Sequence, residues 1–288
     1  MAISIEPSDA TLGAYVSGIS LGSITDTQFE QIYAAFLRYA LLIFPDQHLT
    51  NKQQQAFAER FGAIEILVEG LKTIPVSNKP EHGETYGSDD HRTKLLKGNE
   101  GWHTDSSYMP LSAKASVLSA HVLPREDGET EWADMRDAYE QLDESRQSKL
   151  GSMNAYHSYF HSQAKVGHQV KAGAGYGFFE GEPPLHPLVK VHPETGRRAL
   201  FIGRHIKCIA GMGEPETQSL IDELTTFACR PPRLLKHQWS VGDIAVWDNR
   251  CLLHRARPYD MAQARVMMHT RVSGDPETES ALNYPAAG

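Results

Sequence analysis

The chain has 288 residues, enough for one large domain with a buried core, and its 40% hydrophobic and 22% charged residues are typical of a globular protein. Its formal net charge of −8 and the lack of a basic stripe argue against a nucleic-acid partner, because binding to phosphates needs clustered positive charge. No stretch approaches the roughly 20 apolar residues of a membrane helix. The N-terminal residues MAISIEPSDATLGAYV lack the basic and apolar regions of a signal peptide, so a cytoplasmic location is expected.

The three cysteines are expected to be reduced thiols. Their odd number prevents complete pairing within one chain, and none forms a CxxC pattern. Free thiols are typical of the cytoplasm. Cys251 lies in an apolar segment without a catalytic His/Asp group, so we interpret it, like Cys208 and Cys229, as a structural residue and not as a nucleophile.

The first expected elements are a helix, a strand and a second helix. Apolar residues at helical spacing follow Thr25 and predict the first helix. The apolar run 40–44, which a proline stops, predicts a buried strand. A capping box at Thr50 and Gln53 predicts the start of the second helix, and Gly62 is expected to close it.

Two later segments have few signs of regular structure. Residues 66–98 are rich in turn formers and predict a mobile surface loop, which acts either as a lid over a site or as a solvated connector. Residues 158–187 form a variable region that is rich in glycine and aromatic residues, and its Phe178 is a candidate for a substrate pocket.

The remaining pattern predicts a mostly β fold with helical cover. Many short strands with a few helices are typical of a sandwich or barrel. No composition break divides the chain, so we expect one domain over residues 1–288. The expected strands are 115–123, 199–203, 244–247 and 266–272, and the expected helices are 134–150 and one around 220–227.

His103-Thr104-Asp105 and the downstream His254 are candidates for a metal site. If the tripeptide lies in a strand, alternation puts His103 and Asp105 on the same side. Two imidazoles and one carboxylate hold non-haem Fe(II) on one face and leave the opposite positions open. The same ligand types also suit zinc, so a zinc hydrolase remains an alternative. A single HxD pattern is weak by itself in a chain with 14 histidines.

Arg265 suggests what else such a metal would hold. Iron with three protein ligands can take both oxygens of a 2-oxo acid and keep a position for O2. The far carboxylate of that acid needs a fixed cation, and the planar guanidinium pairs with it bidentately. We expect His254 and Arg265 on neighbouring strands, one co-substrate length apart.

Four motifs together resemble the taurine dioxygenase / 2,4-dichlorophenoxyacetate dioxygenase family of Fe(II)- and 2-oxoglutarate-dependent oxygenases. They are WHTDSSY, GETEWADMRDAYE, VGDIAVWDNRCLLHRA and RVMMHTRVSGD, and the likeness runs from about Thr11 to Glu279. The resemblance implies a double-stranded β-helix, or jelly roll. It also implies hydroxylation coupled to decarboxylation of 2-oxoglutarate. The most similar branch acts on aryloxyalkanoates, whose ether bond then breaks, and on N-acyl amino acids.

The resemblance also implies residue roles. The iron ligands are His103, Asp105 and His254, and Arg265 and Thr130 bind the distal carboxylate of 2-oxoglutarate. Asn99 lines the site, and Trp247 lies near the co-substrate.

One position departs from the family pattern. Taurine dioxygenase has an arginine for the substrate anion four residues after the co-substrate arginine, and this chain has His269 there. Arg271 is the nearest arginine, and strand alternation puts both residues on the face of Arg265. Either could bind the anion. The other substrate-binding candidates are Ile66, Val68, Tyr108, Arg204 and His205.

We therefore predict a dioxygenase that hydroxylates a small carboxylate with an apolar body. A taurine, alkylsulfonate or sulfate-ester substrate is the alternative within this class. Outside it, the alternatives are the zinc hydrolase and a ligand-binding jelly roll without metal. We expect a homo-oligomer that binds neither nucleic acid nor membrane.

Overall fold

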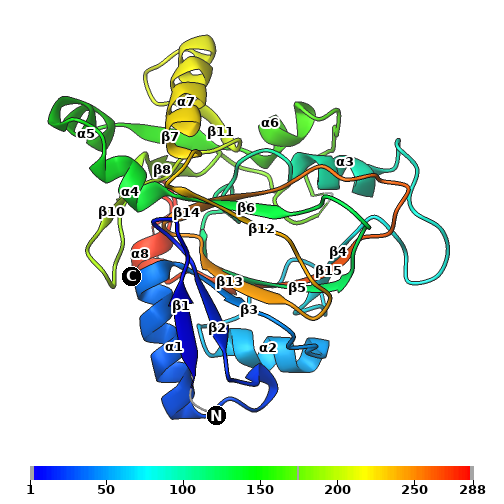
Figure 1. Cartoon of the computed structure of the whole chain (residues 1–288). Coiled ribbons are helices and arrows are strands. Elements are labelled where there is room, and N and C mark those ends of the chain that lie inside the picture. Colours follow the sequence, from blue (N-terminus) through cyan, green and yellow to red (C-terminus); the bar gives the residue numbers. More distant parts are fainter. Residues whose placement is uncertain (1–2, 174, 286–288) are drawn as a thin grey trace.

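The computed structural model describes residues 3–173 and 175–285. Its largest sheet has seven strands, and a three-stranded sheet lies over it (Figure 1). In order across the large sheet, the strands are β1 (Ser4–Pro7), β2 (Ala14–Ser17), β3 (Leu41–Phe44), β13 (Ile244–Asp248), β5 (Ala113–Val122), β15 (Val266–Ser273) and β4 (Ile74–Ser77). The smaller sheet contains β12 (Leu234–His237), β6 (Thr130–Asp134) and β14 (Leu252–Ala256). The structure thus has the strand-rich core that the sequence predicts.

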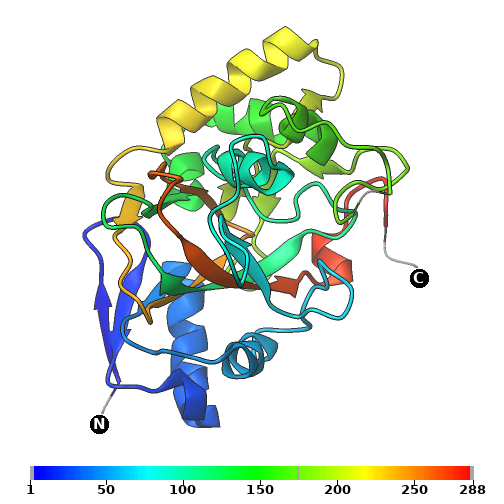
Figure 2. The ribbon, with the colours of Figure 1, turned by 90° about the vertical axis from the view of Figure 1, so that its right-hand side faces the viewer.

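Two helices cover the outer face of the large sheet (Figures 1 and 2). α1 (Asp26–Tyr39) begins after Thr25 and α2 (Asn51–Glu59) after Thr50, and each starts with a threonine–glutamine capping box. The predicted starts of both helices are confirmed. Ala40 caps the C-terminal end of α1 with a left-handed φ of 61°, so β3 begins one residue later than predicted.

β3 shows how the large sheet is covered on both faces. Leu42 and Phe44 pack against the helices on the outer face. Leu41 and Ile43 point the other way, into the core between the two sheets. Neighbouring strand residues alternate between faces, so a strand that is covered on both sides is apolar at every position.

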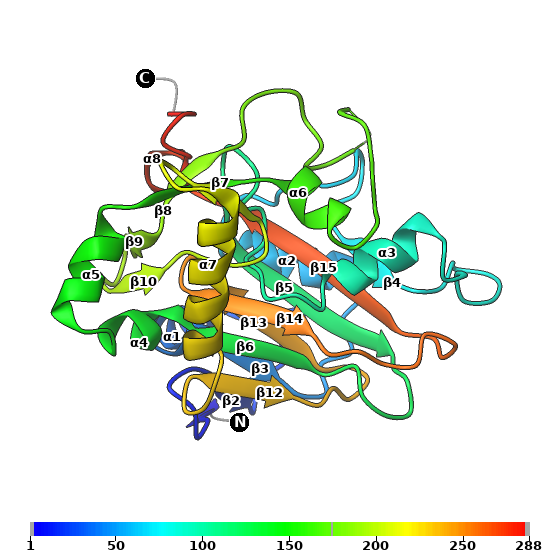
Figure 3. The ribbon, with the colours of Figure 1, turned by 90° about the horizontal axis from the view of Figure 1, so that it is seen from above.

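The smaller sheet carries one of the predicted metal ligands. β14 pairs antiparallel with β6, and His254 lies opposite Trp132. Trp132 packs against Trp239 and Trp247 in the core between the sheets. α7 (Glu214–Ala228) contains the helix predicted around 220–227, and its apolar face packs into the core as it crosses over the smaller sheet (Figure 3).

The segment 66–98 contains a strand and a helix within the expected loop. β4 forms the edge of the large sheet beside β15. It tolerates Pro75 because an edge strand needs ladder hydrogen bonds on one side only. α3 (His91–Gly98) starts at Asp90, whose carboxylate accepts a hydrogen bond of 2.8 Å from the backbone N–H of Arg92. Elements this short leave little periodic signal in a sequence.

The single helix predicted over 134–150 is wrong in its length. The structure has α4 (Met135–Glu140) and α5 (Glu144–Gly151), because Asp143 caps a new helix after a short turn. Downstream, the region 158–187 contains α6 (Tyr159–Ala164) and β8 (Leu185–Pro187).

Smaller elements complete the molecule. β8 joins β7 (Asn154–His157) and β11 (Ile206–Ile209) in a second three-stranded sheet, and β9 (Val189–Val191) pairs with β10 (Arg198–Leu200). A short η1 (Leu21–Ser23) and α8 (Pro276–Glu279) lie near the two ends of the chain. Among the helices of the described residues, none combines the length and the apolar character that crossing a membrane requires.

His157 in β7 should make the protein acid-sensitive. It is buried, neither ring nitrogen has a hydrogen-bond partner among the residues that the structure describes, and burial lowers its pKa from 6.5 to about 3. Between these values the unfolded state binds the proton and the folded state does not, so stability is lost as the pH falls below 6.5. We expect His157→Leu to shrink the difference in unfolding free energy between pH 8 and pH 5 by about 2 kcal/mol.

Urea denaturation at both pH values measures this difference. His82→Leu, at an exposed position, is the matched control and should leave the difference unchanged. An unchanged difference in His157→Leu would show that His157 is not a source of acid sensitivity.

Candidate active site

His103 and His254 are joined by their backbones. Each backbone N–H donates to the carbonyl of the other residue, at 3.0 and 2.9 Å, which forms an isolated antiparallel bridge. The expectation of a regular strand at His103-Thr104-Asp105 is wrong, because residues 105–108 form a turn in which Ser106 has a φ of 53°. The hydroxyl of Thr104 donates to the carbonyl of Leu252 at 3.1 Å and holds this turn against β14.

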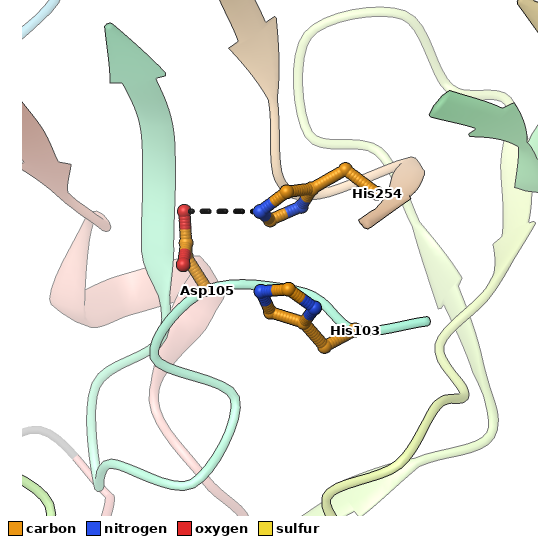
Figure 4. Close-up of side chains that lie close together, drawn as sticks. All are labelled: His103, Asp105 and His254. Carbon is orange, nitrogen blue, oxygen red and sulfur yellow. Dashed lines mark ion pairs between the residues drawn. The ribbon is translucent and has the colours of Figure 1, made fainter. Parts of the chain in front are cut away.

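The three predicted metal ligands nevertheless meet. One donor atom from each of His103, Asp105 and His254 lies within 4.8 Å of the others, and all three residues are buried. Figure 4 shows the side chains pointing toward one another, with Nε2 of His254 3.8 Å from Oδ2 of Asp105. Two nitrogens and one carboxylate oxygen are a donor set that suits Fe(II).

The protonation states also suit a divalent metal. Nδ1 of His103 lies 2.7 Å from the carbonyl of Gly101, so it donates there and leaves Nε2 free as a ligand. Burial lowers the pKa of His103 to about 4 and also lowers the pKa of His254. Burial opposes ionisation of Asp105, but Arg271 and neighbouring histidines hold its pKa well below the usual value. Neutral imidazoles and an ionised carboxylate bind metal without first losing protons.

Arg271 lies against the iron-ligand candidate Asp105. Its guanidinium donates to Oδ1 of Asp105 at 2.8 Å and to the hydroxyl of Ser106 at 2.9 Å. Its Nε lies 3.9 Å from the carboxylate of Glu65. The hydroxyl of Tyr176 contacts both Ser106 and Glu65. Arg271 is therefore compensated by two protein carboxylates.

A cavity of about 470 Å³ connects the predicted site residues. A volume of this size holds a small organic molecule. Its lining includes the three metal-ligand candidates together with Arg265 and Thr130. Apolar side chains from several segments complete the lining, namely Leu67, Val68, Ile74, Val76, Leu95, Leu96, Val170 and Phe178.

Arg265 is a buried cation without an anionic partner among the described side chains. Its NH2 donates to the carbonyl of Gly128 at 3.1 Å, its Nε has no partner, and burial lowers its pKa. Asn78 accepts a 2.8 Å hydrogen bond from the backbone N–H of Arg265 and fixes its position. Because a buried unpaired charge is costly, this arrangement suits an incoming carboxylate.

Thr130 and Arg265 reach the cavity from different sheets. Thr130 begins β6, and its hydroxyl accepts a 2.9 Å hydrogen bond from the indole N–H of Trp239. Arg265 directly precedes β15 of the large sheet, whereas His254 lies in the smaller sheet. The prediction that His254 and Arg265 lie on neighbouring strands is therefore wrong. The two residues line one cavity because the two sheets face each other across it.

Trp247, Asn99 and His269 also line this cavity. The ring of Trp247 lies 4.7 Å from that of His254 and stacks on His269 at 6.0 Å. Asn99 directly follows α3 as its C-cap, and its carbonyl accepts a hydrogen bond of 2.8 Å from the N–H of Ala256. Nε2 of His269 lies 3.5 Å from Asp105, so this imidazole is beside the metal-ligand group.

The other substrate-binding candidates divide into two groups. Val68, Tyr108 and His205 line the cavity. Tyr108 stacks on Tyr159 at 4.2 Å and meets the ring of His205 edge-on. Ile66 is 49% exposed and is not among the lining residues that the structure describes. Arg204 is also absent from the described lining residues, and its guanidinium donates to the carbonyl of Ser162 at 2.6 Å.

Sequence reasoning missed several residues of this site. Leu95 and Leu96 of α3 line the cavity, Glu65 approaches Arg271 from just before the expected loop 66–98, and Tyr176 approaches it from the variable region 158–187. Their position depends on long-range folding of these segments. The one local signal was the Leu95-Leu96 pair in an otherwise polar stretch.

Comparisons with known proteins agree with this geometry. The family model "Taurine catabolism dioxygenase TauD, TfdA family" matches residues 4–271. The chain is 49% identical over 288 residues to a (S)-phenoxypropionate/alpha-ketoglutarate-dioxygenase of Sphingobium herbicidovorans, covering 98% of this chain and 99% of the relative. It is 33% identical to an alpha-ketoglutarate-dependent 2,4-dichlorophenoxyacetate dioxygenase of a Burkholderia species, covering 88% of each chain.

Solved structures agree as well. The crystal structure of AAD-2 in complex with Mn(II) and N-oxalylglycine matches with a TM-score of 0.89 at 35% identity, over 98% of this chain and 99% of that chain. A taurine dioxygenase from Burkholderia xenovorans matches with a TM-score of 0.76 at 28% identity, over 96% and 94%.

The fold and site, with these relatives, define an Fe(II)- and 2-oxoglutarate-dependent dioxygenase that uses O2 as co-substrate. The alternatives of a zinc hydrolase and of a binding protein without metal are set aside. The chain belongs to the taurine catabolism dioxygenase TauD, TfdA family.

Proposed function

We propose that the enzyme hydroxylates a small aryloxyalkanoate, such as a phenoxypropionate, at the carbon that bears the aryloxy group. The carrying observation is one cavity that joins the His103–Asp105–His254 group, the unpaired cation Arg265 and an apolar lining. Hydroxylation at that carbon yields a hemiketal or hemiacetal, which breaks down to a phenol and a 2-oxo acid. The names of two relatives, at 49% and 48% identity, support this substrate class.

In this proposal, His103, Asp105 and His254 hold the iron. Bound Fe(II) supplies oxygen activation coupled to the decarboxylation of 2-oxoglutarate. Asp105 contributes its negative charge, and the two histidines contribute neutral nitrogens. A substrate that fills the cavity would displace water from these buried residues, which protects the reaction from side reactions.

Arg265 and Thr130 would bind the distal carboxylate of 2-oxoglutarate. The free Nε of Arg265 can donate to one carboxylate oxygen. The Thr130 hydroxyl already accepts from Trp239, so its own proton is available for the carboxylate. Asn99 and Trp247 would contact the co-substrate from the remaining sides.

The substrate would occupy the rest of the cavity. Val68 and Tyr108 would contact its aromatic body, and His205 or His269 would meet its carboxylate. Arg271 remains a candidate for binding the substrate carboxylate, but it would first have to give up its contact with Asp105 or Glu65. Ile66 and Arg204 could contribute only from outside the present lining.

An N-acyl amino acid also combines a carboxylate with an apolar body and stays a second candidate. A sulfonate or sulfate ester is less favoured, because the family arginine for that anion is replaced by His269. More distant relatives, at 31% and 28% identity, are an alkylsulfatase and a sulfate ester dioxygenase.

We further propose that the two facing sheets form the double-stranded β-helix of this family, and that residues 1–288 act as one domain. The arrangement of the seven-stranded and three-stranded sheets supports this assignment. A cytoplasmic location, a homo-oligomeric state and the lack of nucleic-acid or membrane partners stay predictions. The three cysteines are free, which is compatible with the location.

Succinate release from 2-oxoglutarate tests the substrate class. We expect phenoxypropionate to stimulate release at least about tenfold more than an alkylsulfonate, because the aryl ether both fills the apolar lining and presents a carboxylate. An N-acyl amino acid also carries a carboxylate, and equal or higher release with it would favour the second candidate. Phenol should appear in step with succinate. Higher turnover with a sulfonate would contradict the proposal.

A further inference from the structure

Asp105 is part of a closed ring of hydrogen bonds with two further side chains. Its Oδ2 accepts from the hydroxyl of Ser116 at 2.6 Å. The Ser116 oxygen accepts from Nδ2 of Asn249 at 2.9 Å. The ring closes where the backbone N–H of Asp105 lies 3.4 Å from Oδ1 of Asn249. The carboxylate and the backbone of one residue are thus held by the same pair of side chains.

The direction of each bond in this ring is determined by chemistry. An ionised carboxylate only accepts, so Ser116 must give its single proton to Asp105. Ser116 can then only accept from Asn249, which requires the amide nitrogen to face it. The amide oxygen consequently faces the indole N–H of Trp247, a pure donor, at 3.0 Å. Only one orientation of the Asn249 amide therefore satisfies the hydrogen bonds of Asp105, Ser116 and Trp247.

The surroundings leave this ring little freedom. Ser116 is 0% and Asn249 1% exposed. Ser116 lies in β5, in the interior of the large sheet, where it is paired with Trp247 of β13 and with Arg271 of β15. A buried side chain with satisfied hydrogen bonds and packed neighbours keeps one rotamer. Asp105 lies in a turn, but these hydrogen bonds to the sheet restrict the orientation of its carboxylate.

We propose that Ser116 and Asn249 are positioning residues that orient Asp105 toward the iron and thereby set the metal affinity. The inference rests on the ligand assignment proposed above. Arg271 neutralises the other oxygen of Asp105, while Ser116 and Asn249 fix the plane of the carboxylate. Partners that orient a metal ligand typically change metal affinity by 10–100-fold when they are removed.

Titration of the metal-free protein with Mn(II), followed by the electron paramagnetic resonance signal of the free ion, tests this role without turnover. Ser116→Ala and Asn249→Ala should each raise the Kd for Mn(II) by about 10–100-fold. At saturating Fe(II), the KM for 2-oxoglutarate should change by less than about threefold, because Arg265 is untouched. An unchanged Kd in Ser116→Ala overturns the proposal.

Ser119 provides a matched control. It is a buried serine of the same strand and makes a 2.6 Å hydrogen bond, but to Gln54 on the outer face. Ser119→Ala should cost stability and leave the Kd for Mn(II) unchanged. Ser116→Thr keeps the hydroxyl and should retain affinity within about threefold. If Ser119→Ala lost as much Mn(II) affinity as Ser116→Ala, the effect would reflect general destabilisation, and the proposal would be overturned.

The double variant tests whether the two residues act as a unit. If the ring of hydrogen bonds orients Asp105, the double variant Ser116→Ala with Asn249→Ala should have a Kd for Mn(II) close to that of the single variant that binds Mn(II) less tightly. Fully additive losses would mean independent effects and would overturn the ring. Asp105→Ala separates the two proposals. If this variant still binds Mn(II), the ligand assignment is wrong. If it loses Mn(II) binding while Ser116→Ala binds normally, only the positioning role is wrong.

Discussion

Asp105→Ala and His103→Ala are each expected to lower succinate release from 2-oxoglutarate by at least about a thousandfold. Each removes one of the three proposed protein ligands, whose donor atoms lie within 4.8 Å of one another. Asp105→Ala also leaves Arg271 without its closest carboxylate, so this variant should lose stability as well. His103→Ala makes no such change and isolates the effect on the metal.

Turnover is measured with saturating Fe(II), 2-oxoglutarate and a phenoxypropionate, and protein stability by thermal unfolding. His82→Ala, at an exposed position, serves as the control and should retain activity. If His103→Ala kept more than about a tenth of the turnover while remaining folded, the ligand assignment would be wrong.

Arg265→Ala is expected to raise the KM for 2-oxoglutarate by about 100-fold. The change removes a buried guanidinium whose hydrogen bonds to a carboxylate are charge-assisted, and about 2–3 kcal/mol corresponds to this factor. The KM for the carboxylate substrate should change far less. Initial rates at varied 2-oxoglutarate and varied substrate measure both constants, and equal effects on both would count against the assigned role.

Arg265→Leu offers an independent readout that needs no turnover. In the protein without 2-oxoglutarate, the guanidinium has an unpartnered Nε and no acidic neighbour within the described part of the chain. Replacing it by an apolar residue removes this unfavourable burial, so the ligand-free variant should unfold at a higher temperature than the wild type. Addition of 2-oxoglutarate should stabilise the wild type and not the variant.

Local features of the fold were predictable because their causes are local. The capping boxes at Thr25 and Thr50 mark the helix starts through contacts between residues three positions apart. The all-apolar β3 indicates a strand that is buried on both faces. The grouping of His103, Asp105 and His254 was predictable for a similar reason, since His103 and Asp105 are adjacent to a common residue and His254 lies in a distinctive motif.

Features that depend on pairing across the chain were not predictable in the same way. The ligand tripeptide is oriented by an isolated bridge to His254 and by a turn at Ser106, not by strand alternation. That β14 and β15 belong to different sheets follows from long-range pairing, which no local pattern of His254 or Arg265 contains. The contacts of Arg271 with Asp105 and Glu65 likewise form between residues that are far apart in the sequence.

Both carboxylate oxygens of Asp105 accept hydrogen bonds from protein side chains, and this has a consequence for how the enzyme acquires its metal. In many small metalloproteins the metal site does not exist before the chain folds around the ion, so that folding and metal binding are one event. Here Arg271 and Ser116 already satisfy both oxygens of Asp105 within the protein. We therefore expect the chain to fold without iron and to bind the ion afterwards at the proposed ligands, whose carboxylate is already held in place. Loss and reloading of the ion then become reversible steps of a folded enzyme.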